Sequence, residues 1–192
     1  MNWDDENDVL GAVKKYVNAL QHASKRLGND KNFMLKVVKH NVDALCFAPN
    51  KILNNKGFFL EAIKINCSAL AKASDRLKDD KELVLAAVKQ DGNILQVVSS
   101  RLKDDKEVVL AAIEKYGYAS AWASERLNND REILNSARSY LMSEDCCDYE
   151  VFIKLKENLL AYDAQDKREK ELREKLEGIK PTTSLKPERK KI

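Results

Sequence analysis

Hydrophobic residues recur along this chain with a period of 25 residues. Two neighbouring segments show the period best, DKELVLAAVKQDGNILQVVSSRLKD at residues 80–104 and DKEVVLAAIEKYGYASAWASERLNN at residues 105–129. Three further copies precede them, at residues 5–29, 30–54 and 55–79, and a sixth copy begins at Asp130 and then loses the pattern. We number these segments copies one to six. A tandem period of this length predicts an array of stacked units that share one core.

The first half of each copy predicts an amphipathic α-helix. Apolar residues recur there at helical spacing, and a leucine stands at one shared position in five copies: Leu10, Leu35, Leu60, Leu85 and Leu110. Asp79 and Asp104 are the expected N-caps, because a glutamate three positions later can return a hydrogen bond to the cap. Gly92 and Gly117 are expected to end the helix in the left-handed conformation that glycine adopts at helix C-termini.

The second half of each copy predicts another short helix, with the stripe Ala69, Leu70, Ala73 and Leu77 in copy three. Two helices of about ten residues cannot bury their stripes alone, so the copies must stack. The predicted fold is all-α: a right-handed α-solenoid of five to six 25-residue helix-turn-helix repeats with a C-terminal capping helix. In copy two Pro49 replaces a serine, which predicts a kinked or shortened second helix.

Beyond Tyr140 the sequence predicts a different organisation. Phe152, Leu155 and Leu159 share one helical face, which is suited to cover the open end of the stack. We therefore divide the chain into a helical-repeat domain (residues 1–140), a capping and extended helix (residues 141–177) and a disordered basic tail (residues 178–192).

Charge and hydropathy narrow the class of protein. The chain carries a net charge of +3, of which its last 15 residues contribute +4, so the repeats are close to neutral. This argues against a nucleic-acid contact spread over the repeats, and we predict neither nucleic acid nor a membrane as the partner. No run of about 18 uncharged apolar residues occurs, and the acidic start lacks the apolar run of a signal peptide.

The residues that carry chemistry do not converge on a catalytic site. A Gly-rich phosphate loop, an HExxH motif and a nucleophile motif are all absent from the sequence, so we predict no catalytic residues, no cofactor, no metal and no small-molecule substrate. Cysteines 46, 67, 146 and 147 show no zinc spacing and are interpreted as reduced thiols. The alternative is an enzyme with a cysteine-dependent site, in a cleft shared by Cys46, His40 or the irregular copy two.

Comparison of the copies gives a better candidate site. Positions that vary freely in the second half are three or four residues apart and should form one outward face, a common binding surface of repeat proteins. Exposed aromatic residues are typical anchors of protein interfaces. The predicted partner-binding residues are His22, Phe47, Tyr116, Tyr118, Trp122 and Glu125. For Trp122 the alternative is packing beneath the sixth copy or the C-terminal helix.

Residues 80–129 also resemble the short helical repeats called domain of unknown function 4116, found in effector proteins that intracellular bacteria such as Legionella inject into host cells. The resemblance covers about residues 5–138 and brings no catalytic residues. It implies a protein-interaction module: a virulence effector secreted by a type IV system, or a regulator or inhibitor of another effector. The expected partner is then a host protein or a bacterial effector, and the expected location is the bacterial cytoplasm or, after secretion, the host cytosol. A third possibility is binding of nucleic acid or an anionic membrane through the basic tail.

Overall fold

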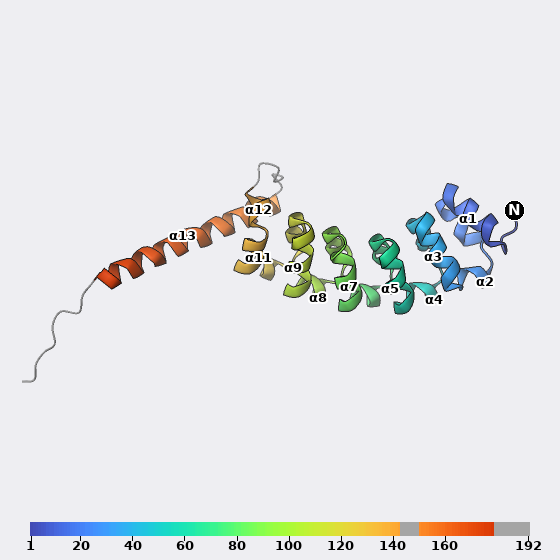
Figure 1. The fold of residues 1–192 in the computed structure, drawn as a ribbon, viewed down its shortest axis with the longest axis horizontal. Coiled ribbons are helices and arrows are strands. Elements are labelled where there is room, and N and C mark those ends of the chain that lie inside the picture. The colour runs from blue at the N-terminus through green and yellow to red at the C-terminus, as the bar shows by residue number, and fades with distance from the viewer. Residues whose placement is uncertain (143–149, 179–192) are drawn as a thin grey trace, which may run out of the picture.

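The computed structural model describes residues 1–142 and 150–178. Every regular element in these two ranges is a helix, so the predicted all-α class is confirmed. The copies follow one another in a row, and each long helix contacts the long helix of the next copy (Figure 1). That the row winds as a right-handed solenoid stays a prediction.

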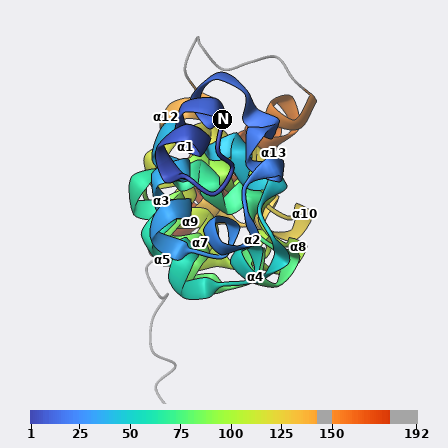
Figure 2. The ribbon, with the colours of Figure 1, turned by 90° about the vertical axis from the view of Figure 1, so that its right-hand side faces the viewer.

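Each of the five complete copies contains three helical elements. The long α-helices come first: α1 (Glu6–Lys15), α3 (Lys31–His40), α5 (Lys56–Ile65), α7 (Lys81–Val88) and α9 (Lys106–Lys115). Six-residue 3₁₀-helices follow: η1 (Val17–His22), η2 (Val42–Phe47), η3 (Cys67–Lys72), η4 (Gly92–Val97) and η5 (Gly117–Trp122). Short α-helices close the copies: α2 (Lys25–Gly28), α4 (Asn50–Leu53), α6 (Asp75–Lys78), α8 (Ser100–Lys103) and α10 (Glu125–Asn128). Seen from the N-terminal end, the long helices lie on one side of the row and the short helices on the other (Figure 2).

The prediction of one continuous second helix in each copy is therefore wrong. Its apolar residues are buried as expected, but two extended residues separate a 3₁₀-helix from a short α-helix. In copy three these are Ala73 and Ser74. The amide of Ser74 donates to the carbonyl of Leu53 in the preceding copy, at 3.0 Å, rather than to its own helix. This bond between copies requires the extended backbone that interrupts the helix.

A carboxylate strengthens the same junction. The Ser99 hydroxyl donates to the side chain of Asp79 in the preceding copy, and the Arg101 guanidinium donates to the Asp79 carboxylate at 3.0 Å and to its carbonyl at 2.7 Å. We call this arrangement the clasp. It recurs as Asp104 with Ser124 and Arg126, and as Asp4 with Ser24 and Arg26. In each clasp the serine hydroxyl, followed by the arginine, holds the pKa of the aspartate below its ordinary value.

Copies two and three lack a complete clasp. Asn54 stands in the carboxylate position before Ser74, whose buried hydroxyl has no hydrogen-bond partner among the described residues. In copy two Pro49 replaces the serine, so the amide bond to the preceding copy is lost as well. Pro49 does not kink a helix, contrary to the prediction, because it is the N-cap of α4 with an extended backbone.

The Asp-Lys-Glu triplets, directly after the clasp aspartates, join the N-terminal ends of the long helices. Asp80 and Asp105 are the true N-caps of α7 and α9, one residue later than predicted, because Asp79 and Asp104 belong to the clasps. Lys81 bridges to the next copy, with its Nζ 2.7 Å from Asp105 and 2.8 Å from Glu107. The same ion pairs link Lys56 to Asp80 and Glu82, and Lys106 to Asp130 and Glu132. The glutamate thus binds the preceding copy and not its own cap.

The glycines serve close packing rather than helix termination. Gly92 begins η4 and Gly117 begins η5, and neither adopts the left-handed conformation that was predicted. A Cβ on Gly92 would lie 2.3 Å from the carbonyl oxygen of Ala112, and one on Gly117 would lie 2.6 Å from the Cβ of Tyr140. A side chain at either position would collide with a helix of the next copy, α9 at Gly92 and α12 at Gly117, so these two positions require glycine.

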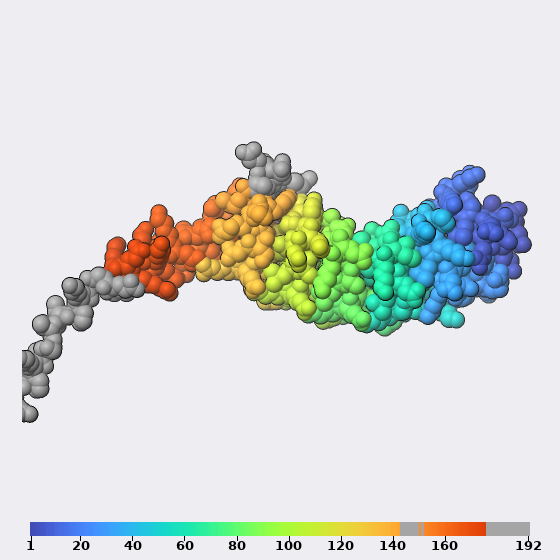
Figure 3. Space-filling model, in the orientation of Figure 1, coloured from blue at the N-terminus to red at the C-terminus, as the bar shows by residue number. Residues whose placement is uncertain are grey.

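The C-terminal helix closes the row as predicted. Copy six contains only α11 (Arg131–Ser136) and α12 (Arg138–Leu141), and α13 (Glu150–Gly178) packs on both. Phe152, Leu155 and Leu159 are buried and join a hydrophobic core that starts at Val9. Beyond this contact α13 projects away from the repeats (Figures 1 and 3).

No described helix is both long and apolar enough to cross a membrane. The predicted disordered tail, apart from Gly178, lies outside the described residues, as do Cys146 and Cys147.

Gly92→Ala tests the close approach of neighbouring copies. The added methyl group meets backbone that cannot move alone, so the variant should lower the free energy of unfolding by about 1–3 kcal/mol in urea titrations followed by circular dichroism. The matched control is Gly11→Ala, within α1 and with no neighbouring atom within 4 Å, which should raise stability by about 1 kcal/mol. Equal effects of the two variants would contradict this role for Gly92.

The clasps predict a specific acid sensitivity. Because the pKa of the clasp aspartates is lowered in the folded state, their contribution to stability is present above the unfolded-state pKa of about 3.9 and is lost as the pH falls through the native pKa. Urea midpoints of Asp79→Asn/Asp104→Asn should therefore fall less steeply between about pH 5 and pH 3 than those of the wild type. Asn54→Asp, which places a carboxylate opposite Ser74, should steepen the fall. Parallel pH profiles in all three proteins would show that the clasps contribute nothing.

Candidate interaction surface

The positions that differ most among the copies gather on the 3₁₀-helices and the first residues of the short helices. We call these fifteen residues the variable surface. Ten of their side chains are exposed, and Ser68, Lys72, Val97, Tyr118 and Trp122 are partly buried. The full set is Asn18, His22, Lys25, Asp43, Phe47, Asn50, Ser68, Lys72, Asp75, Asn93, Val97, Ser100, Tyr118, Trp122 and Glu125.

Phe47 borders a cleft between copies one and two. Its side chain is 38% exposed, at the end of η2. The cleft has a volume of about 180 Å³, and Pro49 and Gly28 form part of its wall. Pro49 has no amide hydrogen, so the Gly28 carbonyl does not receive the bond that the corresponding carbonyls receive from Ser24, Ser74, Ser99 and Ser124. The junction between copies one and two therefore contains the exposed ring of Phe47 and a backbone carbonyl, that of Gly28, that receives no hydrogen bond from the following copy.

His22 lies at the same position one copy earlier and is also exposed. Its ring packs on Trp3 with 5.0 Å between ring centroids, and its Nε2 lies 3.1 Å from the Nε2 of Gln21. His22 and Phe47 are thus equivalent residues in neighbouring copies, as the repeat alignment predicts.

The aromatic cluster of copy five is only partly available to a partner. Tyr118 packs against Phe152 of α13 with 4.7 Å between ring centroids, and against Trp122 at 6.2 Å. Trp122 is partly buried, and its buried indole N–H has no acceptor among the described residues. Tyr116 is the exposed member, with 44% of its surface accessible. Packing against the C-terminal helix was the alternative expected for Trp122. The structure shows this packing for Tyr118, which contacts both its own repeat and the capping helix.

Glu125 opens the short helix α10 and is exposed. Its carboxylate lies 3.8 Å from the Nζ of Lys154 on α13. A small cleft of about 100 Å³ separates the two helices, with Asn128 and Asn158 in its wall. The C-terminal helix thus extends the variable surface beyond the repeats, which the variation among copies alone could not indicate.

The docking of α13 reproduces the contacts of a repeat. Asn129 occupies the clasp position of copy five, and it receives hydrogen bonds from Asn158 to its side chain and from Tyr162 to its carbonyl, both at 2.8 Å. Arg131 occupies the position of Lys106 and pairs with Asp166 of α13. Arg138 forms a bidentate pair with Asp163, at 2.7 and 2.9 Å. Sequence comparison missed these residues because α13 has no repeat pattern.

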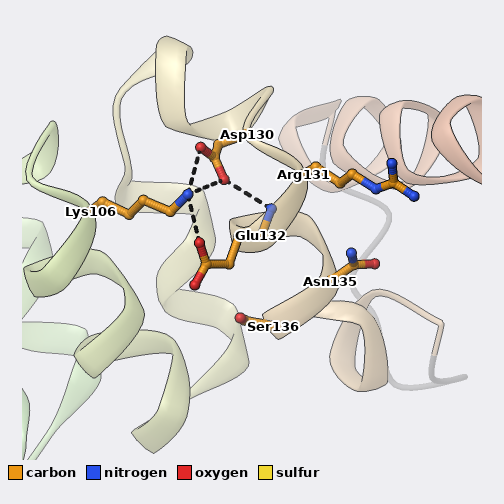
Figure 4. A pocket seen from close by; sticks show the side chains of 6 residues that line it. All are labelled: Lys106, Asp130, Arg131, Glu132, Asn135 and Ser136. Atoms are coloured by element: carbon orange, nitrogen blue, oxygen red, sulfur yellow. Dashed lines mark hydrogen bonds and ion pairs between the residues drawn. The ribbon is translucent and has the colours of Figure 1, made fainter.

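A surface hollow lies where the lysine bridge of copy five ends (Figure 4). It has a volume of about 560 Å³ and is lined by Lys106, Asp130, Arg131, Glu132, Asn135 and Ser136. Lys106 donates hydrogen bonds to the carboxylates of Glu132 and Asp130, which raise the pKa of Lys106 and lower the pKa of Asp130. The charges in this hollow neutralise one another, so their evident role is to join copies five and six.

The structure bears on the cysteine alternative mainly through Lys72, which makes side-chain hydrogen bonds with Asp43 and with Cys46. Cys46 is exposed and Cys67 is partly buried, and burial raises the pKa of the Cys67 thiol, which favours the unreactive protonated form. His40 ends α3 on the surface. Among residues 1–142 and 150–178, no group of three or more histidine, cysteine or acidic side chains is arranged to hold a metal ion.

Comparison with known proteins identifies the repeats. The family model described as Domain of unknown function (DUF4116) matches residues 5–53, 55–103 and 105–137. Its first two segments each contain two of the 25-residue copies and end at a junction between copies, so the family unit corresponds to a pair of copies. No curated protein and no solved structure is similar enough to this chain to count as a match.

Phe152→Ala tests whether α13 holds the aromatic cluster in place. Loss of a buried phenylalanine costs about 3–5 kcal/mol, and here the loss should release α13. In a Trp3→Phe background, Trp122 emission should shift to the red and the α13 amides should exchange faster with solvent.

The control for this experiment is the neighbouring Ile153→Ala. Ile153 is 47% exposed, so its truncation should change stability by no more than about 0.5 kcal/mol. Unchanged emission and unchanged exchange in Phe152→Ala would show that the capping helix is not needed to order the cluster.

Proposed function

The chain belongs to the DUF4116 family, and we propose that its tandem copies present the variable surface to another protein. The observation that carries this proposal is the division of each copy into constant and variable positions. Constant positions supply the buried core, the clasps and the lysine bridges. Variable positions concentrate on the second half of each copy, where ten of the fifteen side chains are exposed, although Lys72 and Asp43 form an ion pair between copies at 2.9 Å.

The chemistry of the variable surface fits a protein partner. It alternates aromatic side chains such as Phe47 with polar and charged ones such as Lys25 and Asp75. Interfaces between proteins have this mixed character, with aromatic anchors surrounded by polar groups. The surface extends along five copies, so it suits an extended contact more than a compact ligand.

The partner that we propose is a host protein or another bacterial effector. This part of the proposal rests on the effector proteins that carry similar repeats, and it includes secretion into the host cytosol and a role as regulator or inhibitor. The absence of a membrane-spanning helix in the described residues is compatible with this location.

Paired variants at exposed positions test the surface. Partners captured by the full-length protein from host lysate, and from the secreted proteins of the source organism, should be identified and their affinity measured with His22→Ala/Phe47→Ala. Truncation of an aromatic anchor typically costs 1 kcal/mol or more, so the affinity should fall about fivefold to thirtyfold. The control is Glu61→Ala, an exposed residue on the outer side of α5.

Three outcomes are informative. Loss of affinity in the double variant alone supports the variable surface. Equal affinity in the wild type, the double variant and the control places the interface elsewhere, for example on α13. A protein that captures no partner from either source contradicts the proposal.

A further inference from the structure

Positive charge is distributed unevenly between the two ends of the long helices. At the N-terminal ends, Lys56, Lys81 and Lys106 are each neutralised by two carboxylates. At the C-terminal ends, exposed lysines form no ion pair within the described part of the chain. They stand in the last turn of a long helix or directly after it: Lys14, Lys15, Lys39, Lys64, Lys89 and Lys115.

These lysines form a row because the copies stack in register. Lys14, Lys39, Lys64 and Lys89 occupy one repeat position, 25 residues apart. Neighbouring packed helices are about 8–10 Å apart, so the row from α1 to α9 extends over roughly 40 Å. We call it the lysine edge, and it lies opposite the short helices that line the lower side of the row in Figure 1. Within three residues of these six lysines along the chain, the acidic residues are Glu61, Asp91 and Glu114.

Exposed apolar side chains lie between these lysines. Tyr16, Val17 and Ile65 are 66%, 40% and 45% exposed, and Tyr116 is 44% exposed. Each is next to a lysine of the edge or one residue further along the chain. The helix dipole favours lysine at a helix C-terminus, but it does not favour exposed isoleucine, valine or tyrosine there. The combination of both kinds of residue therefore calls for a separate explanation.

We propose that the lysine edge binds the surface of an anionic lipid bilayer. Lysines attract acidic headgroups, and long lysine side chains allow neighbouring apolar groups to enter the interface. Tyrosine is enriched at the boundary between headgroups and acyl chains, and Val17 and Ile65 add apolar surface at the same level. The edge extends along the row of copies, because its lysines recur at the ends of successive long helices, and contact with a flat bilayer requires such an extended surface.

A lipid surface fits this edge better than a nucleic acid does. The exposed aliphatic side chains Val17 and Ile65 have no role against phosphate groups. The edge also contains no arginine, the residue that binds phosphate with two parallel hydrogen bonds, because the arginines of the five complete copies stand in the short helices. The near-neutral net charge of the repeats does not oppose this contact, because the unpaired lysines are concentrated at one edge.

Sedimentation with vesicles tests the proposal on the full chain. The protein should bind vesicles of phosphatidylcholine containing one third phosphatidylserine, should not bind pure phosphatidylcholine, and should be released by added salt. Each lysine near an anionic surface changes binding about fivefold, so Lys39→Gln/Lys64→Gln/Lys89→Gln should bind on the order of 100-fold more weakly. Ile65→Ser should also weaken binding, at unchanged charge.

The matched control removes three exposed lysines from the opposite side of the row. Lys25, Lys31 and Lys51 stand in the first turns of α2, α3 and α4, and Lys25→Gln/Lys31→Gln/Lys51→Gln changes the net charge by the same amount. This control should retain most of the binding. Circular dichroism should show that both triple variants keep the wild-type helix content.

The proposal is overturned by any of three results. The first is no binding of the wild type to the acidic vesicles. The second is equal weakening by the edge variant and its control, which indicates attraction by net charge alone. The third is loss of binding in a chain that ends at Gly178, which assigns the membrane contact to the basic tail. Binding to labelled DNA that depends on the edge lysines, without vesicle binding, would identify nucleic acid as the ligand instead. None of these results bears on protein binding by His22 and Phe47, which lie on the variable surface.

Discussion

A hydrogen bond between neighbouring copies organises this protein. After the 3₁₀-helix of copies three, four and five, a serine such as Ser99 donates its amide to a carbonyl at the end of the preceding short helix, here that of Lys78. That bond holds the chain extended at one point and so divides the second half of the copy into two short helices. The clasp reinforces it, because a buried or half-buried hydroxyl without a partner is costly and Asp79 supplies the acceptor. Where Pro49 removes the bond, the surface opens into a cleft beside Phe47.

The same repetition separates structural residues from those free to serve function. The two aspartates of the Asp-Asp-Lys-Glu sequence have different partners: Asp104 accepts from Ser124 and Arg126 of the next copy, whereas Asp105 caps its own helix. Lysine and glutamate then form ion pairs with neighbouring copies. These contacts account for most of the constant polar residues, so the variable ones are left as candidates for recognition. The capping helix closes the pattern with Asn158, Tyr162 and Asp166 in place of a further copy.

Charge pairing has a second consequence. Near the N-terminal ends of the long helices, the carboxylates form ion pairs with lysines of neighbouring copies. The lysines at the C-terminal ends form no ion pair within the described residues. A chain whose repeats are nearly neutral thereby acquires one basic edge. The 3₁₀-helices of the variable surface begin where the long helices that carry the lysine edge end, for example at Tyr116 between α9 and η5, whereas the short helices of the variable surface lie at the other side of the row.

The sequence by itself determined the all-α class, the 25-residue unit, the long helices and the capping face of Phe152, Leu155 and Leu159. Each follows from local periodicity, which one chain displays directly. Only the tertiary structure decided which aspartate caps a helix, why Gly92 and Gly117 are glycine, and that the second half of a copy is not one helix. It also decided that Tyr118 packs on the capping helix while Phe47 and Tyr116 stay exposed. These features depend on atoms 20 to 35 residues apart in the chain, and a pattern of local spacing does not record which distant groups satisfy one another's hydrogen bonds.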